Sequence, residues 1–313
     1  MQDVSWRFCC VGKQKLLTFA TKYRITRGRE ARQPCPLSEH NRDFSSYRAG
    51  MNLNDWIQEQ ECRGRTTFSV KELRCVFRGS SESVMKTDIS RLHASGRIQM
   101  VYRGFYVIVP VQYRLKGVVP PPYYINELMS YLKKPYYVGL LSAAAVYGAA
   151  HQRALETQVV TIAPRSRTSR NKLISWNYRQ QIPPHLLVTR NAEMGIIKYS
   201  NPELTAIDLV QFATNIGGYG RVATVLTELM EVVDINKIIE VVPYTTTPAL
   251  QRMGYLLENV LFEQEKADAL YNILRESKTA LKPIPLSTEQ PLTSAERNRW
   301  RVNPNVNIEI DEL

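Results

Sequence analysis

Residues 80–110, SSESVMKTDISRLHASGRIQMVYRGFYVIVP, decide the expected fold of the front of this chain. In the first part of this stretch, Met85, Ile89 and Leu92 are spaced i, i+4 and i+7, so they fall on one face of a helix. Gly96 predicts the end of that helix, because glycine readily adopts the left-handed conformation that closes many helices. The serines at its start are candidate N-caps. The pattern therefore predicts an amphipathic helix.

The second part of the stretch predicts a β-hairpin. Apolar residues alternate with other residues on both sides of the pair Arg103–Gly104, at Ile98, Met100 and Tyr102 and then at Phe105, Val107 and Val109. A period of two is typical of strands, and a glycine between two such runs is typical of a hairpin turn. A basic hairpin after an amphipathic helix indicates a wing, with Arg97 and Arg103 expected at phosphates or in a minor groove.

Two further helices are expected before this stretch. The first begins after Asn52 or Asn54, either of which can be its N-cap. Residues 69–77, SVKELRCVF, form the second. Ser69 can cap this helix and, with Glu72, can form a capping box.

Three helices followed by a basic hairpin predict a winged helix-turn-helix over residues 51–112, with the third helix placed to enter a DNA major groove. The polar face of that helix mixes hydroxyls with Lys and Arg, which suit contacts with bases and phosphates. The predicted DNA-binding residues are Ser69, Lys71, Ser81, Ser83, Lys86, Thr87, Ser90, Arg91, Arg97 and Arg103. Two other interpretations stay open: a charged helix face can be merely solvated, and some winged helices serve only as protein-interaction modules.

The overall composition permits two globular domains and favours an acidic partner. Of the 313 residues, 44% are hydrophobic and 22% are charged, so long disorder is not expected away from the ends. The formal net charge of +12 favours partners that carry phosphates. No run of 18 apolar residues occurs, so no membrane-spanning helix is expected. The five cysteines are odd in number and fit no metal-ligand spacing, which indicates a reduced, cytoplasmic protein.

The first fifty residues differ from the rest of the chain. They contain three of the five cysteines and ten basic against four acidic residues, so half of the net charge lies here. They show no sustained helical or strand period, and no apolar core of a signal peptide follows their first charges. Because Met51 opens a clean helical pattern, we expect translation to begin there. A basic arm that wraps DNA, or a disordered tail, is the alternative.

A proline-containing connector, residues 113–122, precedes a larger domain expected over residues 123–313. Its pattern mixes helices and strands, so the expected fold class is α/β in the broad α+β sense. Strands are expected at 158–163, 174–178, 186–189 and 195–199, with a last strand in the tail. Helices are expected at 124–132, 138–149, 202–213, 221–233, 235–241, 248–261 and 265–275. Asn201 and Pro202 give the third of these helices a clear start.

The sequence shows no catalytic constellation. The four histidines form no HxH, HExxH or Ser-His-Asp spacing, and no Asp with a Glu-x-Lys pair on adjoining strands points to a nuclease. The glycines of NIGGYGR (215–221) follow a helix and lack a GK[ST] sequence, so they predict a helix–helix turn and not a phosphate loop. We therefore expect a protein that is not an enzyme and that uses no cofactor or metal.

One basic cluster stands out in the larger domain. It lies in APRSRTSRNK (163–172) and consists of Arg165, Arg167, Arg170 and Lys172. These cations could contact phosphates or an acidic partner, although a solvated loop explains them equally well.

Several segments, taken in order, resemble one protein family. GFYVIVP (104–110) at the end of the hairpin is followed by YYVGLLSAAAVYGAAHQ (136–152), YSNPELTAIDLV (199–210), LTELMEVV (226–233) and LQRMGYLLE (250–258). This order resembles the AbiEi family of antitoxins, from type IV toxin–antitoxin and abortive-infection systems, over residues 51–313. The first fifty residues match nothing in that family, which supports the expected start at Met51.

The resemblance implies a repressor and antitoxin that is not an enzyme. Its winged helix would bind double-stranded DNA at inverted repeats in its own promoter and repress the operon. Its C-terminal domain would oppose a nucleotidyltransferase-like toxin, without necessarily forming a stable complex, and would aid cooperative DNA binding. The family has no invariant contact motif, so the expected DNA contacts remain those of the helical pattern.

Two other functions stay open on the sequence alone. One is a conventional winged-helix transcription regulator whose C-terminal domain senses a ligand, and a toxin-like neighbouring gene would argue against it. The other is a nuclease targeted by the winged helix, which metal-dependent cleavage of plasmid DNA would reveal. Binding to repeats as a dimer and cooperative binding as monomers are both compatible with the pattern.

Overall fold

The structure is a computed structural model that describes residues 51–149, 155–164, 173–192, 195–277, 280–293 and 297–309. The expectation about residues 1–50 falls outside these ranges. The described chain combines helices with β-sheets, which confirms the expected α/β class. No helix in the described ranges is long and apolar enough to cross a membrane.

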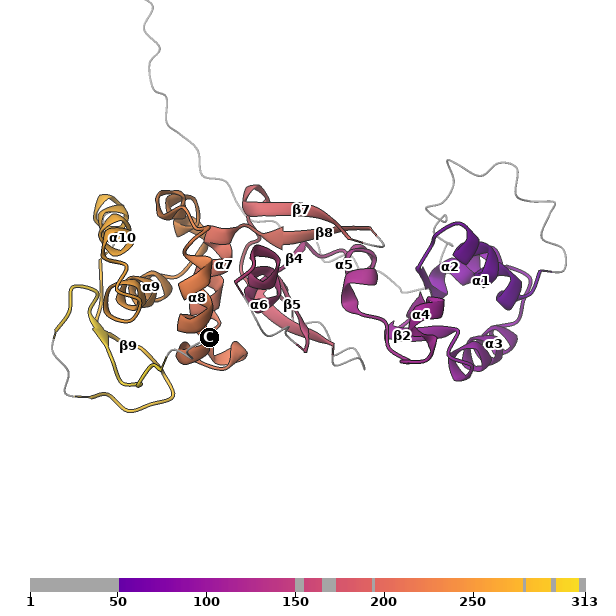
Figure 1. The fold of residues 1–313 in the computed structure, drawn as a ribbon. Coiled ribbons are helices and arrows are strands. Elements are labelled where there is room, and N and C mark those ends of the chain that lie inside the picture. The colour runs from indigo at the N-terminus through magenta and orange to yellow at the C-terminus, as the bar shows by residue number, and fades with distance from the viewer. Residues whose placement is uncertain are drawn as a thin grey trace, which may run out of the picture. The chain divides into compact units, whose positions relative to one another are not determined.

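The front of the described chain forms three helices and a three-stranded antiparallel sheet (Figure 1). The elements are α1 (Leu53–Cys62), β1 (Thr67–Ser69), α2 (Val70–Val76), α3 (Glu82–Ala94), β2 (Ile98–Tyr102) and β3 (Phe105–Ile108). The strand order is β1-β3-β2, and the hairpin turns at Arg103–Gly104 as predicted. This is the arrangement of a winged helix-turn-helix. β1 was not predicted, because three residues are too few to show a strand period.

Each helix of this module begins at a side-chain cap. The side-chain oxygens of Asn52, Ser69 and Ser81 accept hydrogen bonds from backbone amides three residues further on, at 3.0, 3.1 and 3.3 Å. Such caps satisfy amides that have no partner inside the helix, and each contributes about 1 kcal/mol. Glu72 differs from the prediction: its carboxylate accepts a hydrogen bond from Arg65 at 2.7 Å instead of closing a capping box.

The hairpin buries residues on both of its faces. Val101 is an extra residue between Met100 and Tyr102, so the pairing register shifts there. The predicted alternation is therefore wrong for β2: Ile98 and Val101 are buried, whereas Met100 and Tyr102 are half-buried. Ile98 packs in a cluster with α1–α3, and Val101 packs in a second cluster with α5 (Ile125–Leu132).

The segment after the hairpin connects the winged helix to the larger domain. It contains the short helix α4 (Val111–Arg114), and Val119 and Tyr123 further along are buried. Phe105 of the hairpin and Leu128 of α5 belong to the same cluster, which continues onto one face of the C-terminal sheet. The two parts therefore share a hydrophobic core.

A five-stranded mixed sheet forms the centre of the larger domain. Its strands are β4 (Tyr136–Val138), β5 (Thr157–Ile162), β6 (Ile174–Arg179), β7 (Leu187–Ala192) and β8 (Gly195–Ser200), in the order β6-β5-β4-β8-β7. β5 and β6 are parallel, as are β4 and β8, whereas β4–β5 and β7–β8 are antiparallel. β4 is a strand where the sequence predicted none. Its burial alternates, since Tyr136 packs on the α5 side and Tyr137 on the opposite side.

Helices pack on the opposite side of the sheet and against one another (Figure 1). They are α6 (Leu140–Ala144), α7 (Pro202–Gln211), α8 (Tyr219–Leu229), α9 (Thr247–Asn259) and α10 (Gln264–Glu276). Asn201 caps α7 as predicted, because its side-chain oxygen accepts from the Leu204 amide at 2.9 Å. The predicted helix over 138–149 starts later, with α6, because its first residue belongs to β4. The helix predicted at 235–241 is present as a 3-10 helix, Ile235–Glu240.

The described tail folds back over this helical layer. Trp300 is fully buried and lies against Gly254 in the middle of α9. The predicted last strand is reduced to β10 (Val302–Asn303), which pairs in parallel with β9 (Ile284–Pro285).

Candidate nucleic-acid interface

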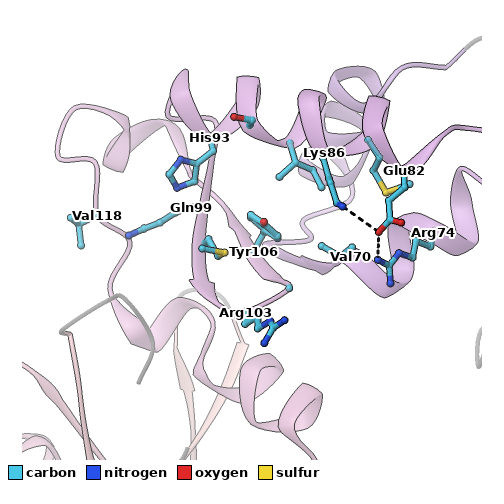
Figure 2. Close-up of a pocket in the computed structure, with 14 residues that line it drawn as sticks. Val70, Arg74, Glu82, Lys86, His93, Gln99, Arg103, Tyr106 and Val118 are labelled. Carbon is cyan, nitrogen blue, oxygen red and sulfur yellow. Dashed lines mark hydrogen bonds and ion pairs between the residues drawn. The ribbon is translucent and has the colours of Figure 1, made fainter. Parts of the chain in front are cut away.

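An open groove of about 800 Å³ lies between α3 and the β2–β3 hairpin (Figure 2). The apolar side chains that line it include Met85, Ile89, Met100 and Tyr106. The polar side chains that line it include Lys86, Ser90 and His93 from α3, Gln99 from β2 and Arg103 from the hairpin turn. The winged helix thus presents a hollow of mixed character beside its third helix.

The polar face of α3 is open to solvent, as predicted. Its exposed residues are Ser83, Lys86, Thr87, Ser90 and Arg91, and its buried residues are Met85, Ile89 and Leu92. The side chains of Lys86 and Arg91 are 75% and 77% exposed, so a phosphate can reach both from solvent. The pattern therefore placed the two faces of the helix correctly. Contact between the polar face and DNA stays a prediction.

Carboxylates of the same helix hold these cations. Glu82 Oε1 lies 2.7 Å from Arg74 Nη2 and 3.8 Å from Lys86 Nζ (Figure 2). The hydrogen bond from Arg74 and the charge of Lys86 lower the pKa of Glu82. Asp88 lies 3.5 Å from Arg91 in the same way. Exposed pairs of this kind contribute little to stability, so a phosphate can compete for the same cations.

Several predicted hydroxyls already take part in the fold. Ser69 and Ser81 are the N-caps of α2 and α3. Ser83 Oγ lies 3.0 Å from Ser81 Oγ, and Thr87 Oγ1 donates to the Ser83 carbonyl oxygen at 3.0 Å. Substituting these residues would change helix stability as well as any DNA contact. The exposed cations of α3 are therefore sharper probes of binding.

The structure places the predicted arginine Arg97 in an ion pair. Its Nη2 donates to Glu61 Oε2 at 2.8 Å, and its side chain is only 24% exposed. Arg97 therefore links the start of β2 to α1 within the winged helix. Its partner lies 36 residues away in the chain, so local spacing did not indicate the pair.

The hairpin turn is anchored at its tip. The Gly104 carbonyl oxygen accepts from the Val70 amide at 2.9 Å. The Tyr131 hydroxyl donates to the Arg103 carbonyl oxygen at 3.4 Å, and its ring packs against Phe105 with 5.1 Å between centroids. The Arg103 side chain stays exposed beside the groove. The wing is thus held by α2 and α5 through its backbone and through Phe105.

The polar side chains of the groove that were not predicted include Arg74, Glu82, His93 and Gln99. Arg74 follows Lys71 by three residues, a spacing that places both on one side of α2. His93 continues at i+7 the row that begins with Lys86, so the same periodicity could have found it. Lys71 itself is exposed but does not line the groove.

The basic cluster Arg165, Arg167, Arg170 and Lys172 lies outside the described residues. Where the structure does describe the chain, no three His, Cys, Asp or Glu side chains are grouped so that they could hold a metal ion. The contacts of the described residues therefore centre the candidate interface on α3 and the hairpin.

The larger domain contains a buried charged cluster. Asp208 of α7 lies 2.5 Å from Arg179 Nη2 of β6, and the Tyr137 hydroxyl of β4 donates to its other oxygen at 2.6 Å. Burial raises the pKa of Asp208, although Arg179 and Tyr137 oppose the shift. Arg179 also donates to the Tyr244 carbonyl oxygen at 3.0 Å. The cluster joins β4 and β6 to α7 and therefore stabilises the fold of this domain.

The comparison with known families falls on this larger domain. Residues 137–259 match the AbiEi antitoxin C-terminal domain. Over these residues the chain is similar to AbiEi antitoxins. The match runs from β4 to the last residue of α9, so it includes the five strands and the buried cluster. The matching model is that of an antitoxin domain, so the comparison supports an antitoxin role for this part of the chain.

One solved structure is similar in fold over most of the chain. The crystal structure of the RV2827C protein from Mycobacterium tuberculosis is similar in fold, with a TM-score of 0.61 and 14% sequence identity. The similarity covers 80% of this chain and 89% of that one. No curated protein matches the sequence. The likeness extends well beyond the AbiEi domain, and at this identity it concerns the fold alone.

Proposed function

We propose that this AbiEi protein binds inverted repeats in its own promoter through the winged helix and represses its operon. In the same proposal, the AbiEi domain counteracts a nucleotidyltransferase-like toxin, and no stable complex with that toxin is required. Both activities take place in the cytoplasm.

The observation that carries the proposal is the exposed polar face of α3 beside an open groove. The helix has 13 residues, and a B-DNA major groove about 12 Å wide admits one helix. Serine and threonine hydroxyls can bond to any base edge at close approach, and lysine and arginine favour guanine. α3 offers both kinds of group on one side and is held by buried Met85, Ile89 and Leu92 on the other.

The groove adds a place for the sugar–phosphate backbone. With α3 in the major groove, one strand of the duplex would lie between the helix and the hairpin. There Lys86 and Arg103 can meet phosphates, and His93 and Gln99 can donate hydrogen bonds. The apolar residues between them suit deoxyribose rings and thymine methyl groups.

DNA phosphates would replace carboxylates as the partners of the cations on this surface, and this replacement would favour binding. In the free protein, Glu82 pairs with Arg74 and Lys86, and Asp88 pairs with Arg91. Phosphates would take over these cations and release condensed counterions from the DNA. Each phosphate that is neutralised then lowers the slope of log K against log salt by about 0.9.

A gel-shift titration of the full chain tests the DNA part of the proposal. The probes are the duplex upstream of its own gene and a scrambled duplex of equal length and composition, at low and moderate salt. We expect a shift of the upstream duplex at protein concentrations that leave the scrambled one free. Equal, weak and salt-sensitive binding to both would contradict the proposal.

Co-expression with the adjacent gene tests the antitoxin part. We expect the full chain to restore growth that the neighbouring toxin arrests. A variant that has lost promoter binding should still restore growth when both genes are expressed from unrelated promoters. Failure of the wild-type chain to restore growth would contradict the antitoxin part and leave the repressor part standing.

A further inference from the structure

We propose that residues 111–118, the segment directly after the hairpin and called the connector from here on, are a second DNA-contacting element that reaches the minor groove beside the major groove occupied by α3. Leu115 is its apolar tip, and Lys116 binds a phosphate. This inference rests on the proposed function, since it assumes that α3 binds a duplex.

The connector exposes an unusual set of apolar side chains. Leu115 is fully exposed, Val111 is 72% exposed and Val118 is 40% exposed. Single exposed apolar residues are common on protein surfaces, whereas a group of them on one short segment marks an interaction site. The connector, VQYRLKGV, contains no acidic residue. Its Arg114 donates to Glu61 Oε1 of α1 at 3.1 Å, so Lys116 is the cation beside the tip. An apolar tip next to a cation fits a polyanion with an apolar interior, which is the chemistry of a DNA groove.

Hydrogen bonds hold the connector at both ends. The Tyr113 hydroxyl donates to the Tyr123 hydroxyl at 3.0 Å, and their rings meet edge-to-face at 5.0 Å. The Gly117 amide donates to the Tyr113 carbonyl oxygen at 2.9 Å, and its φ of +65° closes the turn after the tip. The amide of fully buried Val119 donates to Gln99 Oε1 at 3.1 Å. The tip is therefore presented in a defined position.

The connector is continuous with the candidate interface. Val118 lines the same groove as α3, next to Gln99 and His93 (Figure 2). The hairpin tip, by contrast, is bonded to Val70 and Tyr131 through its backbone. A duplex seated on α3 would thus meet a fixed hairpin turn and an exposed connector. Proteins that insert apolar side chains into the minor groove use this combination of apolar tip and neighbouring cation.

Hydroxyl-radical footprinting, which reports on sugars lining the minor groove, tests the inference. The proteins are the full-length wild type, the double variant Leu115→Ala/Lys116→Ala, and the control Leu155→Ala/Lys237→Ala. The control removes an equally exposed leucine and a lysine of the larger domain. Because the Leu115 side chain is fully exposed, the connector variant should unfold at the wild-type temperature.

We expect the connector variant to lose protection at the edge of the footprint while it keeps protection at the centre. Its affinity for the upstream duplex should fall about tenfold, and its salt slope should fall by about 0.9. The control should match the wild type in both. A wild-type footprint and slope for the connector variant would overturn the inference and leave the proposed function intact. Normal DNA binding with lost growth rescue would also overturn it and assign the connector to a protein partner. A wild-type chain that shows no specific binding would remove the proposed function and this inference together.

Discussion

Removing one partner of the buried Arg179–Asp208 pair should destabilise the AbiEi domain strongly. The two side chains are 2% and 0% exposed, and their charged atoms lie 2.5 Å apart. Asp208→Ala leaves the guanidinium of Arg179 in the interior without its counter-charge, and arginine keeps its proton even there. Breaking a buried pair in this way costs about 3–5 kcal/mol. The loss is a large part of the roughly 5–15 kcal/mol that is typical of a folded protein.

A combined replacement separates the charge from the packing. Arg179→Met with Asp208→Leu removes both charges and keeps most of the volume, and Tyr137→Phe removes the hydroxyl that would otherwise lack its acceptor. Exchanges of buried ion pairs for apolar groups are often neutral or stabilising. We therefore expect the triple variant to unfold within about 2 kcal/mol of the wild type.

Urea unfolding followed by circular dichroism measures all three free energies. We expect a large loss for Asp208→Ala and a small change for the triple variant. A triple variant as unstable as Asp208→Ala would refute this expectation, because the cost would then come from shape and not from the unpaired charge. A single variant within about 1 kcal/mol of the wild type would refute the claim that the pair is buried in solution.

Glu82→Gln should tighten binding to the upstream duplex, because Arg74 and Lys86 then become available to phosphates. A DNA titration at low salt measures the affinity. Weaker binding of the variant would mean that Glu82 itself accepts a hydrogen bond from a base. In the free protein, the Glu82 carboxyl should titrate below its ordinary pKa of 4.5. The ion pairs of Glu82 are therefore fully formed above pH 4.5 and are lost as the pH falls through the lowered pKa. Carbon-13 NMR of the Glu82 carboxyl measures this pKa. A titration midpoint at the ordinary value would show that the pairs do not form. Gly254→Ala should lower the free energy of unfolding by about 1–3 kcal/mol, because a Cβ there would overlap the indole ring of Trp300. Glycine-to-alanine changes normally favour a helix, so a thermally more stable variant would show that Trp300 does not pack on α9 as described.

The winged helix was predictable because its information is local. Met85, Ile89 and Leu92 alone define the inner face of α3, and the caps Asn52 and Ser69 are set by residues three positions away. β1 and β4 were missed because three-residue strands show no period, and their pairing partners lie far along the chain.

The bulge at Val101 was invisible for a different reason. Val101 is buried because a second hydrophobic cluster, with α5, covers the outer face of the hairpin. Nothing in residues 98–102 indicates that cover. The period of two therefore predicted the strand correctly, but it assigned the wrong side chains of β2 to the buried positions.

The residues of the candidate site also fall into two groups, those that local spacing predicts and those whose roles depend on contacts between distant parts of the chain. The polar face of α3 follows from helical spacing, and the structure exposes Lys86 and Arg91 as expected. The roles of Arg97 and Arg103 depended on tertiary contacts, with Glu61 for one and with Tyr131 for the backbone of the other. The AbiEi domain was recognisable from the order of its segments, yet its Arg179–Asp208 pair joins two elements that are distant in the chain and gave no local signal.

The most direct test of the central claim is the salt dependence of binding to the upstream duplex, between about 50 and 200 mM salt. The full-length proteins are the wild type, Lys86→Ala/Arg91→Ala, and Lys237→Ala/Arg275→Ala as a control that removes the same charge from exposed positions of the larger domain. If α3 is the recognition helix, its variant binds about tenfold or more weakly, with a slope shallower by about 0.9 for each phosphate that it no longer neutralises, and the control binds as the wild type does. Wild-type affinity and slope in the α3 variant would contradict the claim that this helix binds DNA.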